Sequence, residues 1–387
     1  MTTTIRSVET FRLRVPRDNG APTERFRAAP RVRSIYPTAD ELLLVRIATD
    51  DHVGWGEALA PASPEAPGAL IDEVFAPFLV GVDIAAGARP LTRRLQQTGR
   101  ERGHLSGIQA DAIAAVDIAL WDLFGQVTAL PVKTLLGGAN VDAVPVYMSE
   151  VNGASAHAKA ATAALLYERG MERFKVHLVG PPEIALAEYD VVRSEVGTSR
   201  LALDAHWVHG AGDARRLARG LDERGAWFLE APLAPEDVDG HVRLAAYSGT
   251  SIAIGEAMRH RFEFAQWAGA GAMAIAQPDL GRTGITEAIS IATIMGAHHI
   301  PLAPHHSMAS GIAYAAALHV SAAVDDLLAV EWGPRIAERS DSFLDVAFLE
   351  PIGTSGAWIE GGVVAVPAGA GLGIHVDEEA VRRLAAG

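Results

Sequence analysis

The chain has 387 residues, of which 49% are hydrophobic, and a formal net charge of −14 at pH 7. This acidic balance argues against binding to nucleic acid or to an anionic membrane. The absence of cysteine excludes disulfides, thiolate metal sites and cysteine nucleophiles. The N-terminal sequence lacks the basic and then apolar pattern of a signal peptide, so a cytoplasmic protein is expected.

Residues 1–125 are predicted to form an α+β domain. The runs FRLRV, ELLLVRIATD and VGWGEAL alternate or are continuously apolar, as strands are, and a helical stretch follows over residues 108–123. Residues 17–36 lie between the first two runs and are polar, Pro-containing and rich in Arg. They are interpreted as a long loop.

A different rhythm begins at Val144 and defines a second region, residues 126–334. Short apolar runs recur with room between them for one helix and two loops, which is the cadence of a parallel βα barrel. The Ala-rich stretch 308–324 carries no Asp, Glu, Lys or Arg and is interpreted as a buried barrel helix rather than a membrane span. The runs are VPVYMS, RFKVHL, LALDAH, WFLEAP, SIAIGE, MAIAQPD, IPLAPHH and LLAVEW.

The cadence stops after Trp332, and residues 335–387 form a third segment. Its sequence VVAVPAGAGLGIHV is interpreted as a strand, a Gly/Pro turn and a second strand. This segment is expected to pack back on the N-terminal domain.

Three acidic residues each close an apolar run and are spaced 26 residues apart: Asp204, Glu230 and Glu256. A single acid in this position is usually a helix N-cap or a solvated residue. Equal spacing on neighbouring strands instead predicts that the three side chains meet where barrel active sites lie, at the C-terminal ends of the strands. Three carboxylates would repel one another there unless a cation held them, and hard oxygen ligands favour Mg²⁺.

His305 and Asp279 follow the seventh and sixth runs, so their strands are expected to be neighbours. A carboxylate bonded to an imidazole fixes its tautomer and raises its basicity. Considered separately, His305 belongs to a pair of loop histidines, and Asp279 caps the following helix.

Lys175 and His177 lie two residues apart at the end of the second run, so both side chains are expected to face the barrel mouth. The chain has only three lysines, which makes one at a strand end informative; the alternative is a surface lysine with a buried stem. His206 lies two residues beyond Asp204 and is either an acid/base group or a packed histidine. Glu331 ends the eighth run and is expected to hydrogen-bond at the site.

These residues, in this order, resemble the enolase superfamily and, within it, the mandelate racemase subgroup. The resemblance covers nearly the whole chain and is carried by GWGEA at 54–58, by AIAAVDIALWDLFGQVTALPVKTLLGG at 112–138, by the strand-end acids and by GAGLGI. It implies a modified TIM barrel, (β/α)7β, with an α+β N-terminal capping domain that the C-terminal segment completes. A Glu after Gly as third metal ligand, as in Gly255-Glu256, is similar to the racemase subgroup. Muconate cycloisomerase-like chemistry requires a later Lys, and none follows Lys175.

The resemblance also implies residue roles. It implies that Asp204, Glu230 and Glu256 bind one Mg²⁺ per active site and that His305 with Asp279 moves a proton on one face of the substrate. It implies that Lys175 contacts the substrate carboxylate, and that Glu331 hydrogen-bonds this carboxylate opposite the metal.

The sequence departs from the family pattern at four places. The second Lys of the KxK motif is His177, which puts a two-base racemase in doubt. The usual Asn after the first ligand is His206, and some sugar-acid dehydratases of the subgroup have a His there that acts as general acid. The Glu after the second ligand is Ala231, and the GG pair of the sixth loop is 283–284, Thr-Gly.

The sequence therefore favours an enzyme: a Mg²⁺-dependent dehydratase of an aldonic or aldaric acid sugar, working through an enediolate. The enzymatic alternative is a racemase, epimerase or sugar-acid lactone cycloisomerase, and the non-enzymatic one is a barrel that only binds sugar acids or serves in an assembly. The expected partner is a small-molecule carboxylate, with no nucleic acid or membrane, and the chain is expected to be a homo-oligomer. Loop arginines at 25, 27, 31 and 33 either bind a distal substrate group or are solvated.

Overall fold

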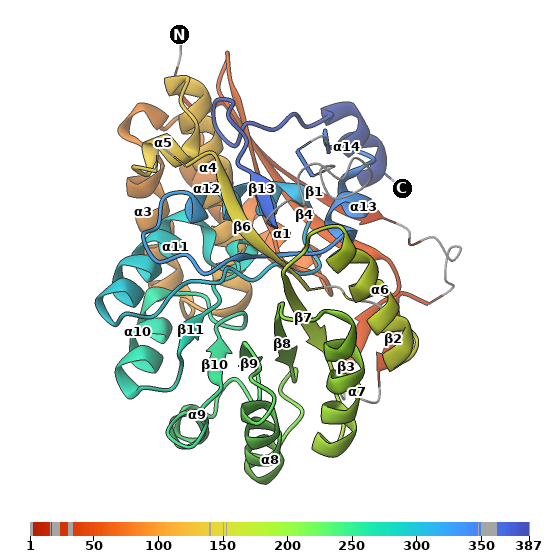
Figure 1. Ribbon diagram of the computed structural model, residues 1–387. Coiled ribbons are helices and arrows are strands. Elements are labelled where there is room, and N and C mark those ends of the chain that lie inside the picture. Colours follow the sequence, from red (N-terminus) through yellow and green to blue (C-terminus); the bar gives the residue numbers. More distant parts are fainter. Residues whose placement is uncertain are drawn as a thin grey trace.

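The computed structural model describes residues 3–15, 17, 24–29, 34–138, 141–149, 151, 153–346, 348–349 and 362–386. An N-terminal α+β part lies against a barrel of parallel strands, and the last helix returns to the N-terminal part (Figure 1).

The N-terminal part is built on a three-stranded antiparallel sheet in the order β1-β4-β5. Its strands are β1 (Ser7–Val15), β4 (Asp40–Ala48) and β5 (Val53–Ala58), and its helices are α1 (Glu65–Leu70), η1 (Ile71–Phe75), α2 (Ala76–Leu79), η2 (Ile84–Ala86), α3 (Ala88–Arg102) and α4 (Gly107–Thr128), followed by α5 (Val132–Leu135).

The glycines of GWGEA explain how α4 packs on β5. A Cβ atom at Gly54 would lie 2.3 Å from the carbonyl oxygen of Ala119, and one at Gly56 would lie 2.0 Å from that of Ala115. Only glycine therefore lets the strand and helix backbones approach this closely.

The loop interpretation of residues 17–36 is wrong for its described part. Two short strands, β2 (Phe26–Ala29) and β3 (Ser34–Pro37), pair antiparallel there. Residues 16, 18–23 and 30–33 lie outside the described residues. The polar composition of the segment concealed this pair, because a two-stranded ribbon on a surface needs no apolar face of its own.

The barrel strands are parallel neighbours in the order β11-β10-β9-β8-β7-β6-β12. The seventh run, IPLAPHH, forms single bridges through Leu302 to Ala276 and to Leu327 instead of a regular strand, and these bridges close the barrel. The strands are β6 (Ala143–Met148), β7 (Arg173–His177), β8 (Arg200–Asp204), β9 (Phe228–Glu230), β10 (Ser251–Ile254), β11 (Ile275–Ala276) and β12 (Val330–Trp332).

Seven helices connect these strands: α6 (Ala156–Glu168), α7 (Pro182–Glu195), α8 (Ala211–Asp222), α9 (Val238–Ala245), α10 (Arg261–Ala270), α11 (Leu280–Ala297) and α12 (Gly311–Ser321). Every residue of α12 is buried, as expected for the stretch 308–324. Among the described residues, no helix combines the length and the hydropathy that crossing a membrane would require.

The C-terminal segment contains α13 (Arg335–Ser340), β13 (Val363–Ala365) and α14 (Glu378–Ala385). Strand β13 pairs with β6 of the barrel, whereas α14 lies against β1, where Arg382 pairs with Glu9 at 3.1 Å. The second strand expected in this segment is wrong, since only isolated bridges form at Gly371 and Val376.

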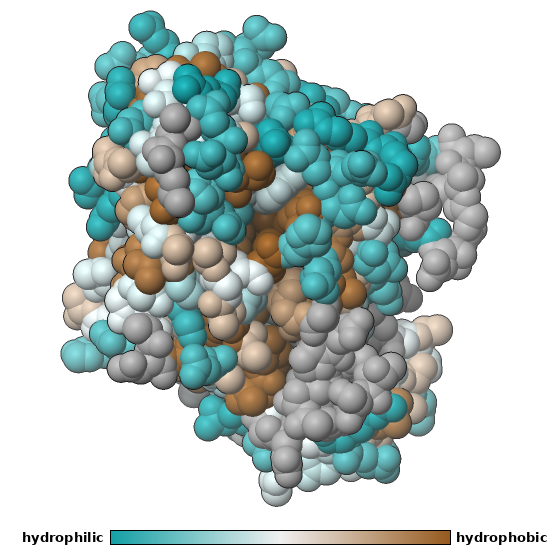
Figure 2. All heavy atoms as spheres, turned by 90° about the horizontal axis from the view of Figure 1, so that it is seen from above, coloured by the Kyte–Doolittle hydropathy of each residue, from teal (hydrophilic) through white to brown (hydrophobic). Residues whose placement is uncertain are grey.

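Buried apolar side chains continue from the N-terminal sheet into the shell between the barrel strands and helices. A separate small cluster fills the barrel interior and includes Tyr147, Phe228 and Ile275. The face that Figure 2 views from above is mostly hydrophilic around its rim and apolar toward its middle.

Buried carboxylates join the N-terminal part to the barrel helices. Glu57, the acid of GWGEA, accepts hydrogen bonds from the backbone N–H and hydroxyl of Ser310, both at 2.7 Å, and from the N–H of Ala313 at 3.0 Å. These groups belong to the start of α12, whose first N–H groups have no partner within the helix. Glu57 therefore caps a barrel helix from a strand of the other part.

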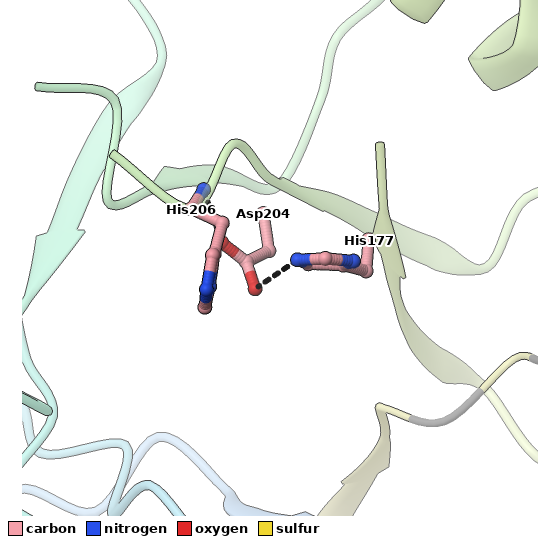
Figure 3. Close-up of side chains that lie close together, drawn as sticks. All are labelled: His177, Asp204 and His206. Carbon is pink, nitrogen blue, oxygen red and sulfur yellow. Dashed lines mark hydrogen bonds and ion pairs between the residues drawn. The ribbon is translucent and has the colours of Figure 1, made fainter. Parts of the chain in front are cut away.

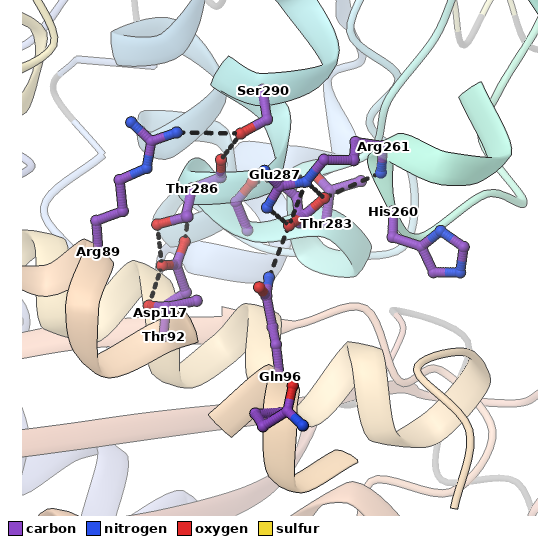
Figure 4. A network of polar contacts seen from close by, with 12 residues as sticks. Arg89, Thr92, Gln96, Asp117, His260, Arg261, Thr283, Thr286, Glu287 and Ser290 are labelled. Atoms are coloured by element: carbon purple, nitrogen blue, oxygen red, sulfur yellow. Dashed lines mark hydrogen bonds and ion pairs between the residues drawn. The ribbon is translucent and has the colours of Figure 1, made fainter. Parts of the chain in front are cut away.

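A second set of contacts joins α3 and α4 to α11 (Figure 4). Asp117 accepts hydrogen bonds from the N–H and hydroxyl of Thr286 at 2.8 and 2.6 Å. Gln96 donates to Glu287 at 2.7 Å, and Arg261 pairs with the same carboxylate. The two parts are thus joined by directional polar contacts as well as by apolar packing.

Burial raises the pKa of Glu57 to about 7, against the hydrogen bonds from Ser310 and Ala313, which lower it. Because the unfolded chain has the lower pKa, about 4.3, it ionises first as the pH rises. The stability that Glu57 contributes is therefore fully present below about pH 4 and is lost between about pH 4 and pH 7, by an amount of the order of 3 kcal/mol.

We expect Glu57→Gln to remove this pH dependence, measured as the free energy of urea unfolding of variant and wild type from pH 4 to pH 8. The exposed Glu73→Gln is the control and should leave the profile unchanged. Parallel profiles for wild type and Glu57→Gln would contradict this account.

Candidate active site

The predicted site residues lie together at the C-terminal ends of the barrel strands. His177, Asp204 and Glu230 are in register on the three consecutive strands β7, β8 and β9. The parallel sheet thereby aligns three polar side chains along one rim.

Glu256 reaches the same rim by a sharp turn after β10. Gly255, which precedes it, has φ of +142°, and a Cβ atom there would lie 2.8 Å from the Phe264 ring and from the Gln277 backbone. Only glycine fits this position. The Gly-Glu pair noted in the sequence therefore has a physical reason, since the glycine aims the glutamate.

Two histidines flank the Asp204 carboxylate (Figure 3). Nε2 of His177 lies 3.9 Å from Oδ2, and the backbone N–H of His206 donates to Oδ1 at 2.8 Å. The two imidazole rings meet edge to face, with centroids 5.0 Å apart. Two nitrogen bases thus lie on either side of one candidate metal ligand.

Lys175 lies deeper in the barrel between two acids. Its ammonium is 2.7 Å from Oε1 of Glu230 and 2.9 Å from Oε1 of Glu331. Burial lowers the pKa of Lys175, but these two carboxylates hold it well above its usual value. Lys175 is therefore a fixed positive charge, and the surface-lysine alternative is wrong.

Burial raises the pKa of Glu230 to about 8, and Lys175 opposes this shift whereas the negative charge of Asp204 adds to it. Its second oxygen accepts a hydrogen bond from Gln277 at 2.5 Å. Burial and Asp204 thus disfavour the ionised form of Glu230, whereas Lys175 favours it.

His305 bonds to two carboxylates at once. Nδ1 lies 2.7 Å from Oδ2 of Asp279, and Nε2 lies 2.8 Å from Oε2 of Glu256. Burial lowers the pKa of His305, but Glu256 and Glu331 raise it well above its usual value. For Glu256, burial acts in the opposite direction and raises the pKa, but the charge and hydrogen bond of His305 bring this pKa down to about 2.

Asp279 has both of the functions considered from the sequence. Its Oδ1 accepts the N–H of Gly281 at 2.9 Å and so caps α11, while its Oδ2 faces His305. The helix cap and the imidazole contact use different oxygens of one carboxylate.

The three predicted metal ligands do not form a single group in this structure. The ligand atoms of Asp204 cluster with those of His177 and His206, whereas Glu230 and Glu256 cluster with His305, each set within 4.8 Å. The donor set nevertheless suits a hard cation, since it offers three carboxylates on adjacent strands. In addition, Oε1 of Glu256 is buried with no hydrogen-bond partner among the described residues.

Reasoning from the sequence missed three residues at this site. Gln277 lies two residues before Asp279, so strand alternation could have indicated it. Tyr147, in the run VPVYMS, donates its hydroxyl to Glu331 at 3.1 Å. The hydroxyl of Tyr36 lies 3.0 Å from Nε2 of His206, and no periodic signal in its Arg-rich segment indicated this contact.

A cavity of about 700 Å³ opens beside the site. Residues from β3 and from the stretch after β5 line it together with barrel residues, among them Tyr36, Leu59, His206, Glu256, Arg282 and Met308. Nε of Arg282 is buried without a hydrogen-bond partner in the described structure. The cavity thus has a local cation in a protein of strongly negative net charge.

Of the four loop arginines considered from the sequence, the structure gives partners for one. Arg25 pairs with Glu41 at 2.7 Å and with Glu65 at 2.8 Å, so protein carboxylates already neutralise it. Arg27 is exposed, and the arginines at 31 and 33 lie outside the described residues.

Comparison with known families agrees with this geometry. The model for the mandelate racemase / muconate lactonizing enzyme N-terminal domain matches residues 25–137, and that for the enolase C-terminal domain-like family matches residues 157–380. The chain belongs to the enolase superfamily. The N-terminal match and its relatives assign it to the mandelate racemase subgroup, so the resemblance and the fold class predicted from the sequence are confirmed.

Relatives within the superfamily include enzymes of sugar-acid chemistry. The D-galactonate dehydratase of Ralstonia nicotianae is 33% identical over 362 residues, which cover 89% of this chain and 91% of the relative. A superfamily member from Agrobacterium tumefaciens has a structure with a TM-score of 0.89, 31% identity and 99% coverage of both chains. The 3,6-anhydro-D-galactonate cycloisomerase from Zobellia galactanivorans has a TM-score of 0.83 and 26% identity, covering 98% of this chain and 99% of its own.

A substitution at Gly255 tests whether the backbone conformation of this glycine directs the Glu256 side chain toward the rim. Gly255→Ala should destabilise the fold by about 1–3 kcal/mol and weaken Mg²⁺ binding, measured by urea unfolding and by calorimetry. Gly269→Ala in α10 is the matched control, because a Cβ atom there meets open space. Wild-type stability and metal affinity in Gly255→Ala would contradict the steric account.

Proposed function

We propose that this protein is a Mg²⁺-dependent dehydratase that converts an aldonic or aldaric acid sugar to a 2-keto-3-deoxy acid. The observation that carries the proposal is the meeting of a carboxylate-oriented imidazole, a buried lysine and three strand-end acids beside one cavity. The D-galactonate dehydratase relative supports the substrate class, because the alignment covers most of both chains.

The first step is removal of the α-proton by His305. Asp279 holds the proton of the imidazole on Nδ1, which leaves Nε2 as the basic atom. Nε2 contacts Glu256 in this structure, so His305 acts as a base only when that contact is released. One Mg²⁺ held by Asp204, Glu230 and Glu256 would supply positive charge to the substrate carboxylate.

Lys175 stabilises the negative charge that develops on the substrate carboxylate as the α-proton leaves. Its ammonium is fixed between Glu230 and Glu331 and needs no reorganisation at that moment. Electrostatic stabilisation by such preorganised groups is usually the largest single catalytic effect.

The second step is departure of the 3-hydroxyl. His206 donates a proton to this oxygen while the C3–O bond breaks and the C2–C3 double bond forms, so the group leaves as water. The resulting enol then loses the proton of its C2 hydroxyl and gains one at C3 to become the 2-keto acid. His177 lies on the other side of the Asp204 carboxylate from His206 and is the alternative acid.

A cycloisomerase is the second candidate, and the Zobellia galactanivorans relative favours it. When the oxygen on C3 belongs to a ring, the same proton abstraction and C3–O cleavage open that ring without releasing water. The product is then an isomer of the substrate. The residues would have the same roles in both reactions, so only the substrate and product distinguish them.

A small-molecule acid-sugar substrate is consistent with the dehydratase relatives. A homo-oligomeric assembly and a cytoplasmic location stay predictions. So do the domain limits 1–125, 126–334 and 335–387.

Removal of one metal ligand tests the cofactor. Glu230→Gln should weaken Mg²⁺ binding more than about 100-fold. Mutation of a residue that only hydrogen-bonds a metal ligand already lowers metal affinity by up to about 100-fold, and Glu230 is itself a proposed ligand. Calorimetry with Mg²⁺ measures this without any substrate, and circular dichroism checks the fold. The exposed Glu236→Gln is the control. Unchanged affinity in Glu230→Gln, or turnover that survives EDTA, would remove the metal assignment.

A screen of hexonates and hexarates, including D-galactonate, with Mg²⁺ present tests the reaction. A dehydratase yields a 2-keto acid that reacts with semicarbazide and has lost the mass of water. His305→Asn should reduce exchange of the α-proton in D₂O by about 10²–10⁴-fold, the usual contribution of a general base. Asp279→Asn should have a smaller effect.

The exposed His298→Asn is the control for the base. Undiminished exchange in His305→Asn would transfer the role of base to His177 or His206. Exchange without any keto acid in the wild type, on every acid sugar of the panel, would favour a racemase or epimerase.

A further inference from the structure

One residue of the N-terminal part reaches the candidate general acid. Tyr36, on β3, places its hydroxyl 3.0 Å from Nε2 of His206, across 170 positions of sequence. Both residues line the cavity, and Tyr36 is only partly buried. The contact therefore joins the part of the molecule that covers the site to the strand end that carries the acid.

The backbone of His206 is held in an unusual conformation. His206 and Trp207 have φ of +48° and +60°, a left-handed region that side chains other than glycine rarely adopt. The N–H of His206 donates to Asp204, and the N–H of Trp207 donates to the carbonyl of Ala231 at 2.7 Å. Such strain persists only where surrounding contacts enforce it, and it is concentrated at functional sites.

The ring of His206 is restrained by stacking on one side. It lies nearly parallel to the Trp207 ring, with centroids 4.7 Å apart and 27° between the planes. Stacking restricts the plane of an imidazole but does not determine which nitrogen faces the cavity. The hydrogen bond with Tyr36 does, because it engages Nε2 specifically.

We propose that Tyr36 is a positioning residue that orients His206 as the proton donor to the departing oxygen. The N-terminal part of the chain would thus position the general acid, which belongs to the barrel. The proposal rests on the proposed dehydratase function. A phenol suits the role because it is neutral and both accepts and donates. Its oxygen accepts from the Nε2–H of His206 before the reaction; when the C3–O bond breaks, this proton passes to the departing oxygen, and the Tyr36 O–H then donates to the Nε2 that has lost it. Tyr36 thereby holds Nε2 at the cavity wall without forming a charged pair.

The proposal separates two steps of the reaction. Proton abstraction depends on His305 and Lys175, whereas departure of the hydroxyl depends on His206, to which the Tyr36 hydroxyl bonds. Tyr36→Phe removes one oxygen and keeps the ring. It should slow 2-keto acid formation from D-galactonate, or from the acid sugar that the screen identifies, by about 10–100-fold, a part of what general acid catalysis contributes.

The α-proton exchange of Tyr36→Phe in D₂O should stay within about twofold of wild type, with KM little changed. A 3-fluoro analogue of the same substrate should recover most of the lost elimination, since fluoride needs less protonation to leave. The exposed Tyr247→Phe is the matched control.

A double-mutant cycle provides the decisive comparison. If Tyr36 acts only through His206, Tyr36→Phe combined with His206→Asn should be no slower in elimination than His206→Asn alone. Additive losses would overturn the proposal, and so would an equal loss of exchange and elimination in Tyr36→Phe, which would indicate substrate or metal binding instead.

NMR of ¹⁵N-histidine-labelled protein tests the contact without substrate. The Nε2 signal of His206, assigned by its absence in His206→Asn, should shift in Tyr36→Phe and stay unchanged in Tyr247→Phe. An unshifted signal would overturn the proposal. Failure of the dehydratase function would instead be visible in the wild type alone, as absence of keto acid, while this spectrum still tests the contact.

Discussion

Repulsion among carboxylates at one rim of the barrel is the constraint on which this structure depends. Five acids converge there: Asp204, Glu230, Glu256, Asp279 and Glu331. Two nitrogen groups, the Lys175 ammonium and the His305 imidazole, offset part of that charge. The remaining negative charge adds to burial in raising the pKa of Glu230, and it fits the affinity for a divalent cation that the donor set implies.

A rim under such repulsion needs rigid support, and the N-terminal part supplies some of it. Glu57 caps α12, which precedes the strand of Glu331, and Asp117 bonds to α11, which begins at Asp279. The helices that follow the sixth and seventh runs are therefore fixed at their N-termini from outside the barrel. Residues distant in sequence from the rim thus help to hold the helices that adjoin it.

The barrel and its rim could be predicted because the regular recurrence of apolar runs and of the acids that end them can be seen directly in the sequence. Equal spacing of Asp204, Glu230 and Glu256 indicated register, and the β8–β9 pairing agrees with it. The pairing of β2 with β3 and the contact of Tyr36 could not be predicted, since they depend on where a polar segment lies in space. Glu230 bonds to Lys175, whereas Glu256 bonds to His305. Which acid bonds to which nitrogen depends on side-chain rotamers, and the spacing of residues in the sequence does not specify these.

The double use of Asp279 has a consequence for how this site changes under mutation. One oxygen anchors the first turn of α11 and the other orients the imidazole, so a substitution at this position alters folding and turnover together. The basicity of His305 therefore cannot be changed through Asp279 without also changing the anchor of α11. When activity is lost on substitution of Asp279, part of the loss reflects lower stability of the fold and part reflects a less basic His305. The two are easily confused at this position.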